Sequence, residues 1–155
     1  MFDHLQWKCR EKFKLKESDI KRIEVNWGIE FPNDFKEVVV KYHGCRPEQD
    51  VFRMNDKEET FNFLLSFSKE DEYNYILSTY EGVKDRLIDK VYPFANDPGG
   101  NLFCFDYRKS DMNPQIVFWD HEVAFEDPEK AITYLCDSFT ELLLNLHEYE
   151  DEEDE

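Results

Sequence analysis

The 155-residue sequence contains no uninterrupted apolar run close to the roughly 20 residues that a bilayer-spanning helix needs. Its first segment, MFDHLQWKCREKFKLK, also lacks the apolar stretch and the small-residue cleavage site of a secretory signal. From these two absences we expect a soluble, cytoplasmic protein.

Basic residues are scarce relative to acidic ones. The chain has 19 Lys and Arg against 36 Asp and Glu, for a formal charge of -17. The last eight residues hold seven carboxylates, which is less than half of that charge, so the body of the protein is acidic as well. This excess disfavours nucleic acid and anionic membranes, because both require Lys and Arg to replace counterions. It favours a basic protein partner, although acidic surfaces also serve simply to keep a protein soluble.

The sequence has few cysteines and none at metal-binding spacing. No CxxC pair occurs, and no histidine stands near a cysteine at the spacing of a zinc site. In a reducing compartment we expect all four to be small buried side chains, with no zinc, no catalytic thiol and no cofactor. They are Cys9, Cys45, Cys104 and Cys136.

The composition is that of one domain. Hydrophobic residues make up 41% of the chain and aromatic residues 16%, which fills one core but not two. We expect a basic arm or first helix over residues 1–17, a single domain over 18–147 and a disordered acidic tail over 148–155.

Apolar residues spaced by three and four predict three helices before residue 90. The first begins at a Ser18 cap and ends at Gly28. The second has Pro32 at its first helical position and ends at Gly44. A third helix is indicated within residues 70–87.

Shorter apolar runs predict strands. VFRMN and TFNFLLSF form an expected hairpin around the polar turn 56–59, and VYPFA, LFCFDY, QIVFW and VAF read as an antiparallel meander. Asp127 and Pro128 then open a long amphipathic helix that runs to His147. The predicted class is α+β: an antiparallel sheet with N-terminal helices, one middle helix and a long amphipathic C-terminal helix.

The stretch DPGGN, residues 97–101, contains the only adjacent glycines. A phosphate-binding loop places its glycines between a strand and a helix, whereas LFCFDY follows here and no Lys-Ser/Thr pair is present. A nucleotide site is therefore not indicated. We interpret Pro98 and Gly99 as the centre of a type II hairpin turn, with Gly100 adding freedom.

Polar residues collect at the strand ends around this turn, where several are expected to lie along one edge. Their plainer role is the local hydrogen bonding typical of turns. EF-hand spacing is absent. The Asp-His-Glu triplet offers a general base, but successive residues of an extended chain point to opposite faces and no nucleophile elbow is present, so an enzyme is not predicted. The set comprises Asp97, Asn101, Asp106, Asp111, Asp120, His121 and Glu122.

Three segments occur in a familiar order. IEFPNDFKEVVVKYHGC combines a proline-initiated helix with a terminal glycine, VYPFANDPGGNLFCFDY joins an apolar strand through a glycine pair to a strand ending in Asp, and QIVFWDHE is a strand closing on Asp-His. This order resembles the SUKH superfamily (the Smi/Knr-like fold) over residues 18–147. The resemblance implies an α+β fold with helices packed on a strongly bent sheet.

The resemblance also implies a function. Many bacterial members of the superfamily are immunity proteins that neutralise the toxin domain, commonly a nuclease, of a polymorphic toxin made by the same cell. It implies stoichiometric inhibition without catalysis or cofactor, and with the acidic composition it favours a basic cognate toxin; the fungal members suggest a regulatory scaffold instead. We expect a monomer or weak dimer. The expected partner-binding edge, with its aromatic residues as anchors if they are exposed, is Asp97, Asn101, Asp106, Tyr107, Trp119, Asp120, His121 and Glu122.

Overall fold

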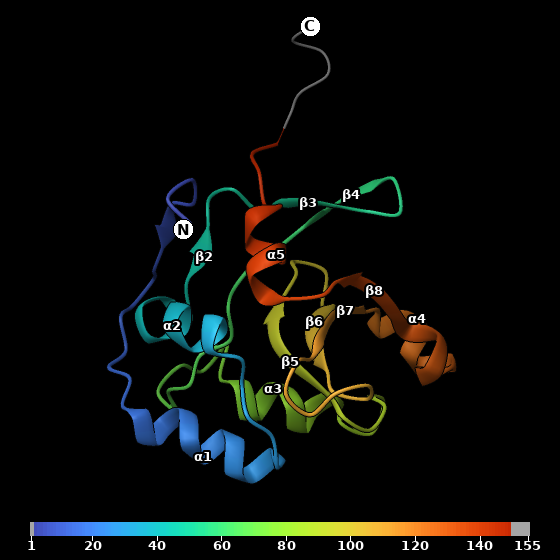
Figure 1. Cartoon of the computed structure of the whole chain (residues 1–155), viewed down its shortest axis with the longest axis horizontal. Coiled ribbons are helices and arrows are strands. Elements are labelled where there is room, and N and C mark those ends of the chain that lie inside the picture. Colours follow the sequence, from blue (N-terminus) through green and yellow to red (C-terminus); the bar gives the residue numbers. More distant parts are fainter. Residues whose placement is uncertain (1, 150–155) are drawn as a thin grey trace, which may run out of the picture.

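The computed structural model describes residues 2–149 and has the predicted α+β class (Figure 1). Its helices are α1 (Glu17–Trp27), α2 (Asn33–Tyr42), α3 (Ile76–Val83), α4 (His121–Glu126), the 3-10 helix η1 (Pro128–Ala131) and α5 (Phe139–Leu144). Its strands are β1 (Trp7–Lys8), β2 (Arg46–Pro47), β3 (Val51–Met54), β4 (Lys57–Thr60), β5 (Val91–Asn96), β6 (Leu102–Asp106), β7 (Gln115–Trp119) and β8 (Ile132–Cys136). Of the predicted acidic tail, residues 150–155 lie outside the described part.

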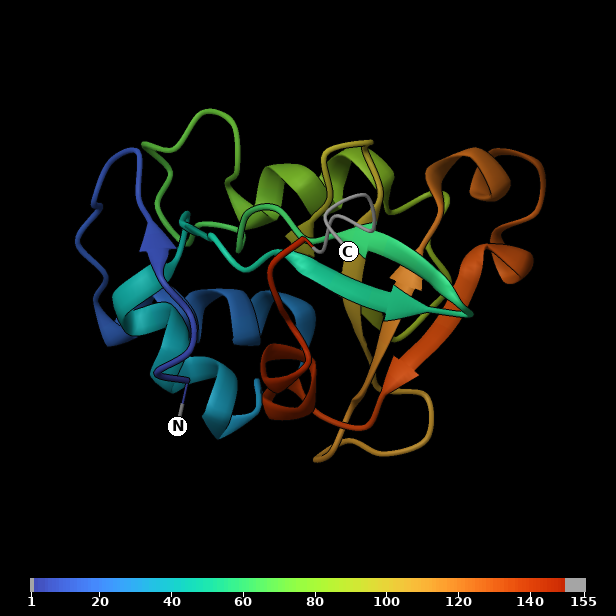
Figure 2. The same ribbon diagram turned by 90° about the horizontal axis from the view of Figure 1, so that it is seen from above.

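The largest sheet is an antiparallel meander in the order β5-β6-β7-β8, with register irregularities in the β5–β6 and β7–β8 pairs. Such irregularities bend a sheet and increase its twist. Figures 1 and 2 place α1 and α2 at one end of the long axis and α4 at the other, with the sheet between them. Consequently α4 projects away from the helices that cover the main core.

The main core joins α2, the sheet and α5 through aromatic rings. The ring centroid of Phe35 on α2 lies 5.0 Å from that of Phe105 on β6 and 5.1 Å from that of Phe139 on α5. Cys104, the neighbour of Phe105 in β6, points to the opposite face and packs in a second cluster with Trp119. Because all five residues of β6 are buried, both faces of the sheet are covered, and its ends and turns remain as surface.

The N-terminal segment is an arm that adds β1 to β2, and the predicted Ser18 cap of α1 is wrong. The N-cap is Lys16, whose backbone N–H donates to Asp19 Oδ2 at 3.0 Å. A carboxylate at the third helical position satisfies this amide, so the helix starts before the serine. Gly28, at a φ of 69°, ends α1 as predicted, and Pro32 precedes α2 as its N-cap instead of occupying its first position.

Two cysteines contradict the expectation of four buried thiols. Cys9 and Cys45 form a disulfide with a Cα–Cα distance of 4.4 Å, whereas Cys104 and Cys136 are free and buried as expected. The antiparallel pairing of β1 with β2 brings the two bonded cysteines opposite each other. Their separation of 36 residues gives no sign of this proximity, which only the folded arm creates.

A hairpin forms after Val51 as predicted, but its turn and its second strand differ from the prediction, which paired VFRMN with TFNFLLSF. Asn55 and Asp56 have φ angles of 50° and 65°, the conformation of a two-residue type I′ turn, so β4 already begins at Lys57. The following apolar run does not continue the hairpin. It enters the core, where Leu64 forms a single bridge to β5.

The long amphipathic C-terminal helix is wrong. Asp127 caps a helix as predicted, but this is the short η1, after which β8 pairs with β7. Only Phe139–Leu144 is α-helical, started by Ser138, whose side chain accepts from Glu141 N at 3.1 Å. The spacing of the apolar residues in 132–136 fits a helix. These residues instead form a strand, because they pair with the free edge of β7. The VAF segment, predicted as a strand, lies within α4 instead.

Candidate functional site

The turn between β5 and β6 is organised by one carboxylate. Asp97 Oδ1 accepts from the backbone amides of Gly99 at 2.9 Å and Asn101 at 2.7 Å. The backbone N–H of Asp97 also donates to the carbonyl of Asn101 at 3.0 Å, which closes a three-residue loop. The left-handed residue is Gly100, with a φ of 92°, and not Gly99. The predicted type II turn is therefore wrong, because that turn requires a positive φ at its third residue.

This turn is joined to the start of α4 through an amide. Asn101 Nδ2 donates to Asp97 Oδ2 at 2.9 Å, and a carboxylate can only accept, so the amide oxygen of Asn101 faces His121. That oxygen accepts from the backbone N–H of His121 at 3.0 Å and from its Nδ1 at 2.7 Å. The imidazole therefore carries a hydrogen on Nδ1, and the turn and the helix are fixed to each other.

Helix α4 is short and begins with a strong cap. Asp120 Oδ1 accepts from the backbone amides of Glu122 at 2.9 Å and Val123 at 3.3 Å. Ala124 is the buried residue of the helix, and Phe125 points outward with 80% of its surface exposed. We call the resulting region the α4 surface; it consists of Asp97, Asn101, Asp120, His121, Glu122, Phe125 and Glu126.

Five of the eight residues predicted to bind a partner gather here, namely Asp97, Asn101, Asp120, His121 and Glu122. Asp106 does not: it lies at the opposite end of β6 and is 4% exposed. Its carboxylate accepts two hydrogen bonds from Arg108, from Nε at 2.9 Å and from Nη2 at 2.7 Å. Burial by itself raises the pKa of Asp106, but the hydrogen bonds and charge of Arg108 outweigh it and lower the pKa.

The two predicted aromatic anchors are inside the protein. Tyr107 is 3% exposed and donates its hydroxyl to the carbonyl of Glu30 at 2.7 Å, and its burial raises the pKa of the phenol. Trp119 is fully buried in the second cluster, and its Nε1 donates to the carbonyl of Arg86 at 3.3 Å. The condition of exposure is met by neither, so neither contacts a partner in this conformation.

Phe125 is the surface aromatic that sequence analysis missed. A strand over residues 123–125 does not predict whether Phe125 is exposed. Asp120 followed by Glu122 is a helix-start signal, and a helix here would have indicated the exposed side. The guanidinium carbon of Arg86 lies 5.8 Å from the Phe125 ring centroid and 5.6 Å from that of Trp119. This arginine connects the exposed ring to the buried one.

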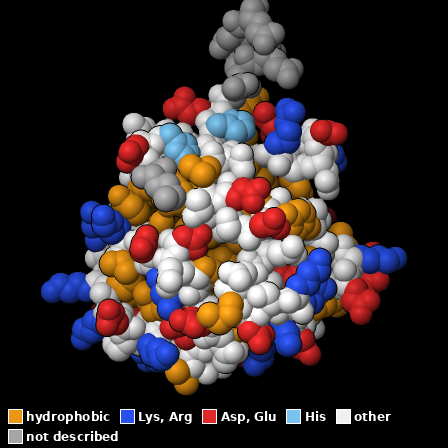
Figure 3. All heavy atoms as spheres, viewed as in Figure 1, with side chains coloured by type: hydrophobic (Ala, Val, Ile, Leu, Met, Phe, Trp, Pro, Cys, Tyr) orange, Lys and Arg blue, Asp and Glu red, His pale blue; other side chains and the backbone are white. Residues whose placement is uncertain are grey.

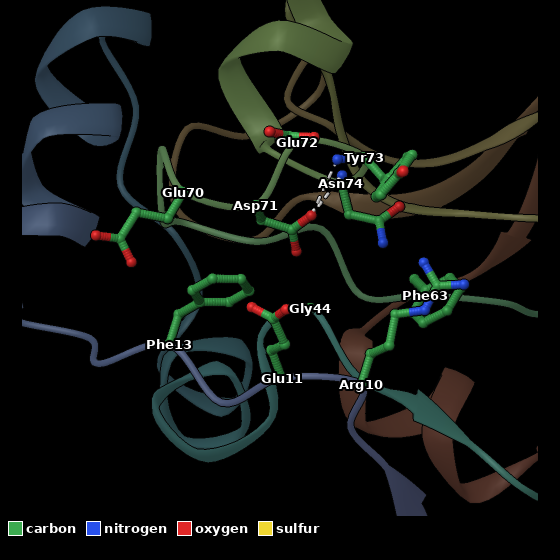
Figure 4. A pocket seen from close by; sticks show the side chains of 10 residues that line it. All are labelled: Arg10, Glu11, Phe13, Gly44, Phe63, Glu70, Asp71, Glu72, Tyr73 and Asn74. Atoms are coloured by element: carbon green, nitrogen blue, oxygen red, sulfur yellow. Dashed lines mark hydrogen bonds between the residues drawn. The ribbon is translucent and has the colours of Figure 1, made fainter.

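A separate cavity of about 270 Å³ lies at the other end of the molecule, between the arm and the loop before α3 (Figure 4). Carboxylates of Glu70 and Glu72 line it together with Arg10 and Tyr73. Asp71 is held by its own loop, because Oδ1 accepts from the Tyr73 amide at 3.1 Å and from the next amide at 2.9 Å. The guanidinium of Arg10 lies 5.6 Å from the Tyr73 ring centroid, so the arm supplies a positive charge to the same cavity.

A buried histidine fixes the N-terminal arm to the body of the protein. Buried His43 accepts at Nδ1 from the Phe67 amide at 3.1 Å and donates from Nε2 to the Phe13 carbonyl at 2.9 Å, which holds the arm in place.

Within residues 2–149, no group of three or more His, Cys, Asp or Glu residues is arranged to hold a metal ion. In the same range no helix has the length and apolarity to cross a membrane.

These features define an α+β protein with helices packed on a bent antiparallel meander. The SMI1 / KNR4 family (SUKH-1) matches residues 14–145, which include every element from α1 to α5, and the chain belongs to this family. The chain is also 26% identical over 144 residues to the SPbeta prophage-derived uncharacterized protein YokK of Bacillus subtilis (strain 168). That alignment covers 82% of this chain and 72% of the relative.

Proposed function

We propose that the chain is an immunity protein that binds a cognate toxin domain, a nuclease with a basic substrate cleft, and neutralises it in a stoichiometric complex. The observation that carries the proposal is membership of the SUKH-1 family over residues 14–145. Immunity against polymorphic toxins is the usual context of bacterial members. Inhibition by occupation requires no catalytic group and no cofactor.

The charge of the chain supports this partner. With 36 acidic against 19 basic residues, the protein attracts a basic surface and accelerates its encounter with one. A nuclease cleft that binds phosphates presents such a surface, and carboxylates can occupy the positions of the phosphates. Figure 3 shows acidic and basic side chains interspersed over one whole face, so complementarity must come from a local group of acids.

The α4 surface provides a suitable local group. It joins most of the predicted edge, and the carboxylates of Asp97 and Asp120 are held by hydrogen bonds to the turn, to the amide of Asn101 and to the start of α4. A surface ordered before binding loses less conformational entropy in the complex. We propose that the carboxylates of residues 148–155 only accelerate the encounter with the basic partner.

We place the action of the protein in the cytoplasm of the toxin-producing cell. There glutathione and thioredoxin would keep Cys9 and Cys45 as thiols. The arm retains the β1–β2 pairing and the stacking of Trp7 on Tyr42, whose ring centroids are 4.7 Å apart. Inhibition is therefore expected with the pair reduced or oxidised.

The test is a pull-down from the native cytoplasm with the tagged chain at moderate salt, followed by a nuclease assay of the recovered protein with and without excess chain. We expect one dominant basic partner whose nuclease activity falls at a one-to-one ratio. Many substoichiometric partners without any inhibited activity would contradict the proposal and favour a regulatory scaffold.

A further inference from the structure

We propose that Phe125 is the anchor of the docking surface, and that it inserts into an apolar socket rimmed by Lys and Arg on the partner protein. The identity of that partner as a toxin rests on the proposed function, whereas the location of the surface rests on the contacts of α4. The acids beside the ring on α4 are the counterpart of the basic rim.

Phe125 is exposed in a way that the fold does not require. Its exposed fraction of 80% is the highest among the large apolar side chains of residues 2–149, while the adjacent Ala124 is 1% exposed. The capped start of α4 and the buried alanine fix the helix and direct the ring into solvent. An aromatic side chain has two rotatable χ angles, so little conformational entropy is lost when it enters a socket.

Arg86 contacts the Phe125 ring and helps to fix its position. The Arg86 guanidinium carbon is close to both rings, 5.8 Å from the centroid of Phe125 and 5.6 Å from that of buried Trp119. Trp119 in turn donates to the Arg86 carbonyl at 3.3 Å. The exposed ring is therefore attached to the second core cluster, as expected of an anchor that is ordered before the partner arrives.

The charges around the ring select the partner. Residues 120–129 contain five carboxylates and no Lys or Arg, so the acids of this segment outnumber Arg86, the cation next to the ring. Lys130 follows, with Nζ 4.0 Å from Asp127, and within residues 2–149 no ion pair involves Glu122 or Glu126. These two glutamates on the helix of Phe125 are available to a basic rim. An acidic peptide, a nucleic acid or an anionic membrane is repelled by the same charges.

Tyr73, at the opposite end of the protein, is a matched control. It is 76% exposed and also carries an arginine, Arg10, at 5.6 Å from its ring centroid. Its charge environment makes it the weaker anchor for a basic partner. Residues 8–16 of the adjoining arm contain five Lys or Arg and one Glu, which offset the acids of the Tyr73 loop.

The experiment replaces Phe125 or Tyr73 of the full chain with the photo-crosslinking residue p-benzoylphenylalanine and irradiates the producing cells. We expect a cross-link from position 125, and not from position 73, to one basic protein whose nuclease activity the chain inhibits. With that protein purified, Phe125→Ala should raise Kd roughly thirtyfold, as for an interface hot spot, and Tyr73→Ala should change it less than about twofold.

The outcomes separate this inference from the proposed function. A cross-link from position 73 alone, or an unchanged Kd for Phe125→Ala, overturns the inference even when one-to-one inhibition is observed. A cross-link from position 125 to a basic protein that is not inhibited supports the docking surface and refutes the immunity role. No cross-link from position 125 to any protein also overturns the inference. Equal thermal unfolding of Phe125→Ala and the wild type excludes misfolding as the cause of a lost interaction.

Discussion

The two adjacent glycines of the β5–β6 turn should respond differently to alanine. Gly100 has a φ of 92°, and a Cβ there would stand 3.4 Å from His121 Cε1. A left-handed backbone costs an L-residue about 1–2 kcal/mol, so Gly100→Ala should destabilise the fold by that amount. Gly99 has no positive φ, and an added Cβ meets its nearest neighbours at 3.7 Å. Gly99→Ala should change the stability by less than about 0.5 kcal/mol or increase it slightly.

Urea unfolding of the two variants and the wild type measures the difference. At this chain length, a loss of 1 kcal/mol lowers Tm by about 2–4 °C, so the loss in Gly100→Ala is also resolved by thermal unfolding. A type II turn places the left-handed residue at Gly99 and predicts the reverse order of the two variants. That order, or equal losses in both, would refute the account of the turn and of the contact that it makes with His121.

Three further perturbations follow from the contacts. Cys9→Ser should lower the free energy of unfolding under oxidising conditions by up to about 4 kcal/mol, the chain-entropy value for a separation of 36 residues, and unfolding with and without dithiothreitol measures it; a loss near zero would mean that the arm is not linked. The folded-state pKa of Asp106 is below its ordinary value of 3.8, so the ion pair with Arg108 stabilises above that value and its contribution is lost as pH falls through the folded-state pKa. Asp106→Asn should therefore be less stable near pH ~7 and lose less stability on acidification to ~3 than the wild type, whereas parallel stability profiles would contradict the pairing. Glu122→Lys and Glu126→Lys should slow association with the partner and weaken its salt dependence, whereas Glu37→Lys, at an exposed position of α2, should do so less; equal effects of all three would indicate net charge alone.

Much of the fold is predictable because glycine and proline mark the ends of its elements. Gly28 ends α1, and the paired glycines separate β5 from β6. The closing segment is not predictable from spacing, since its apolar residues suit a helix as well as a strand. Pairing with β7 decides the outcome at Ile132, and that pairing is a tertiary interaction.

The site was predictable where it depends on turns. Asp97 and His121 were placed at strand ends, and antiparallel pairing of neighbouring strands brings those ends together. Burial was not predictable, because the period of a strand does not show which face meets the core. The sequence thus allows Trp119 as an anchor on the condition of exposure, which its full burial rules out, and the strand predicted at residues 123–125 hides Phe125.

The measurement that tests the central claim most directly is a titration of the partner's nuclease activity with the purified full chain. The account predicts that activity falls in proportion to added protein and reaches background at an equimolar ratio, both with and without reductant. Full nuclease activity at a large excess of the chain, although the two proteins bind, would contradict the immunity role and leave a binding protein of another kind.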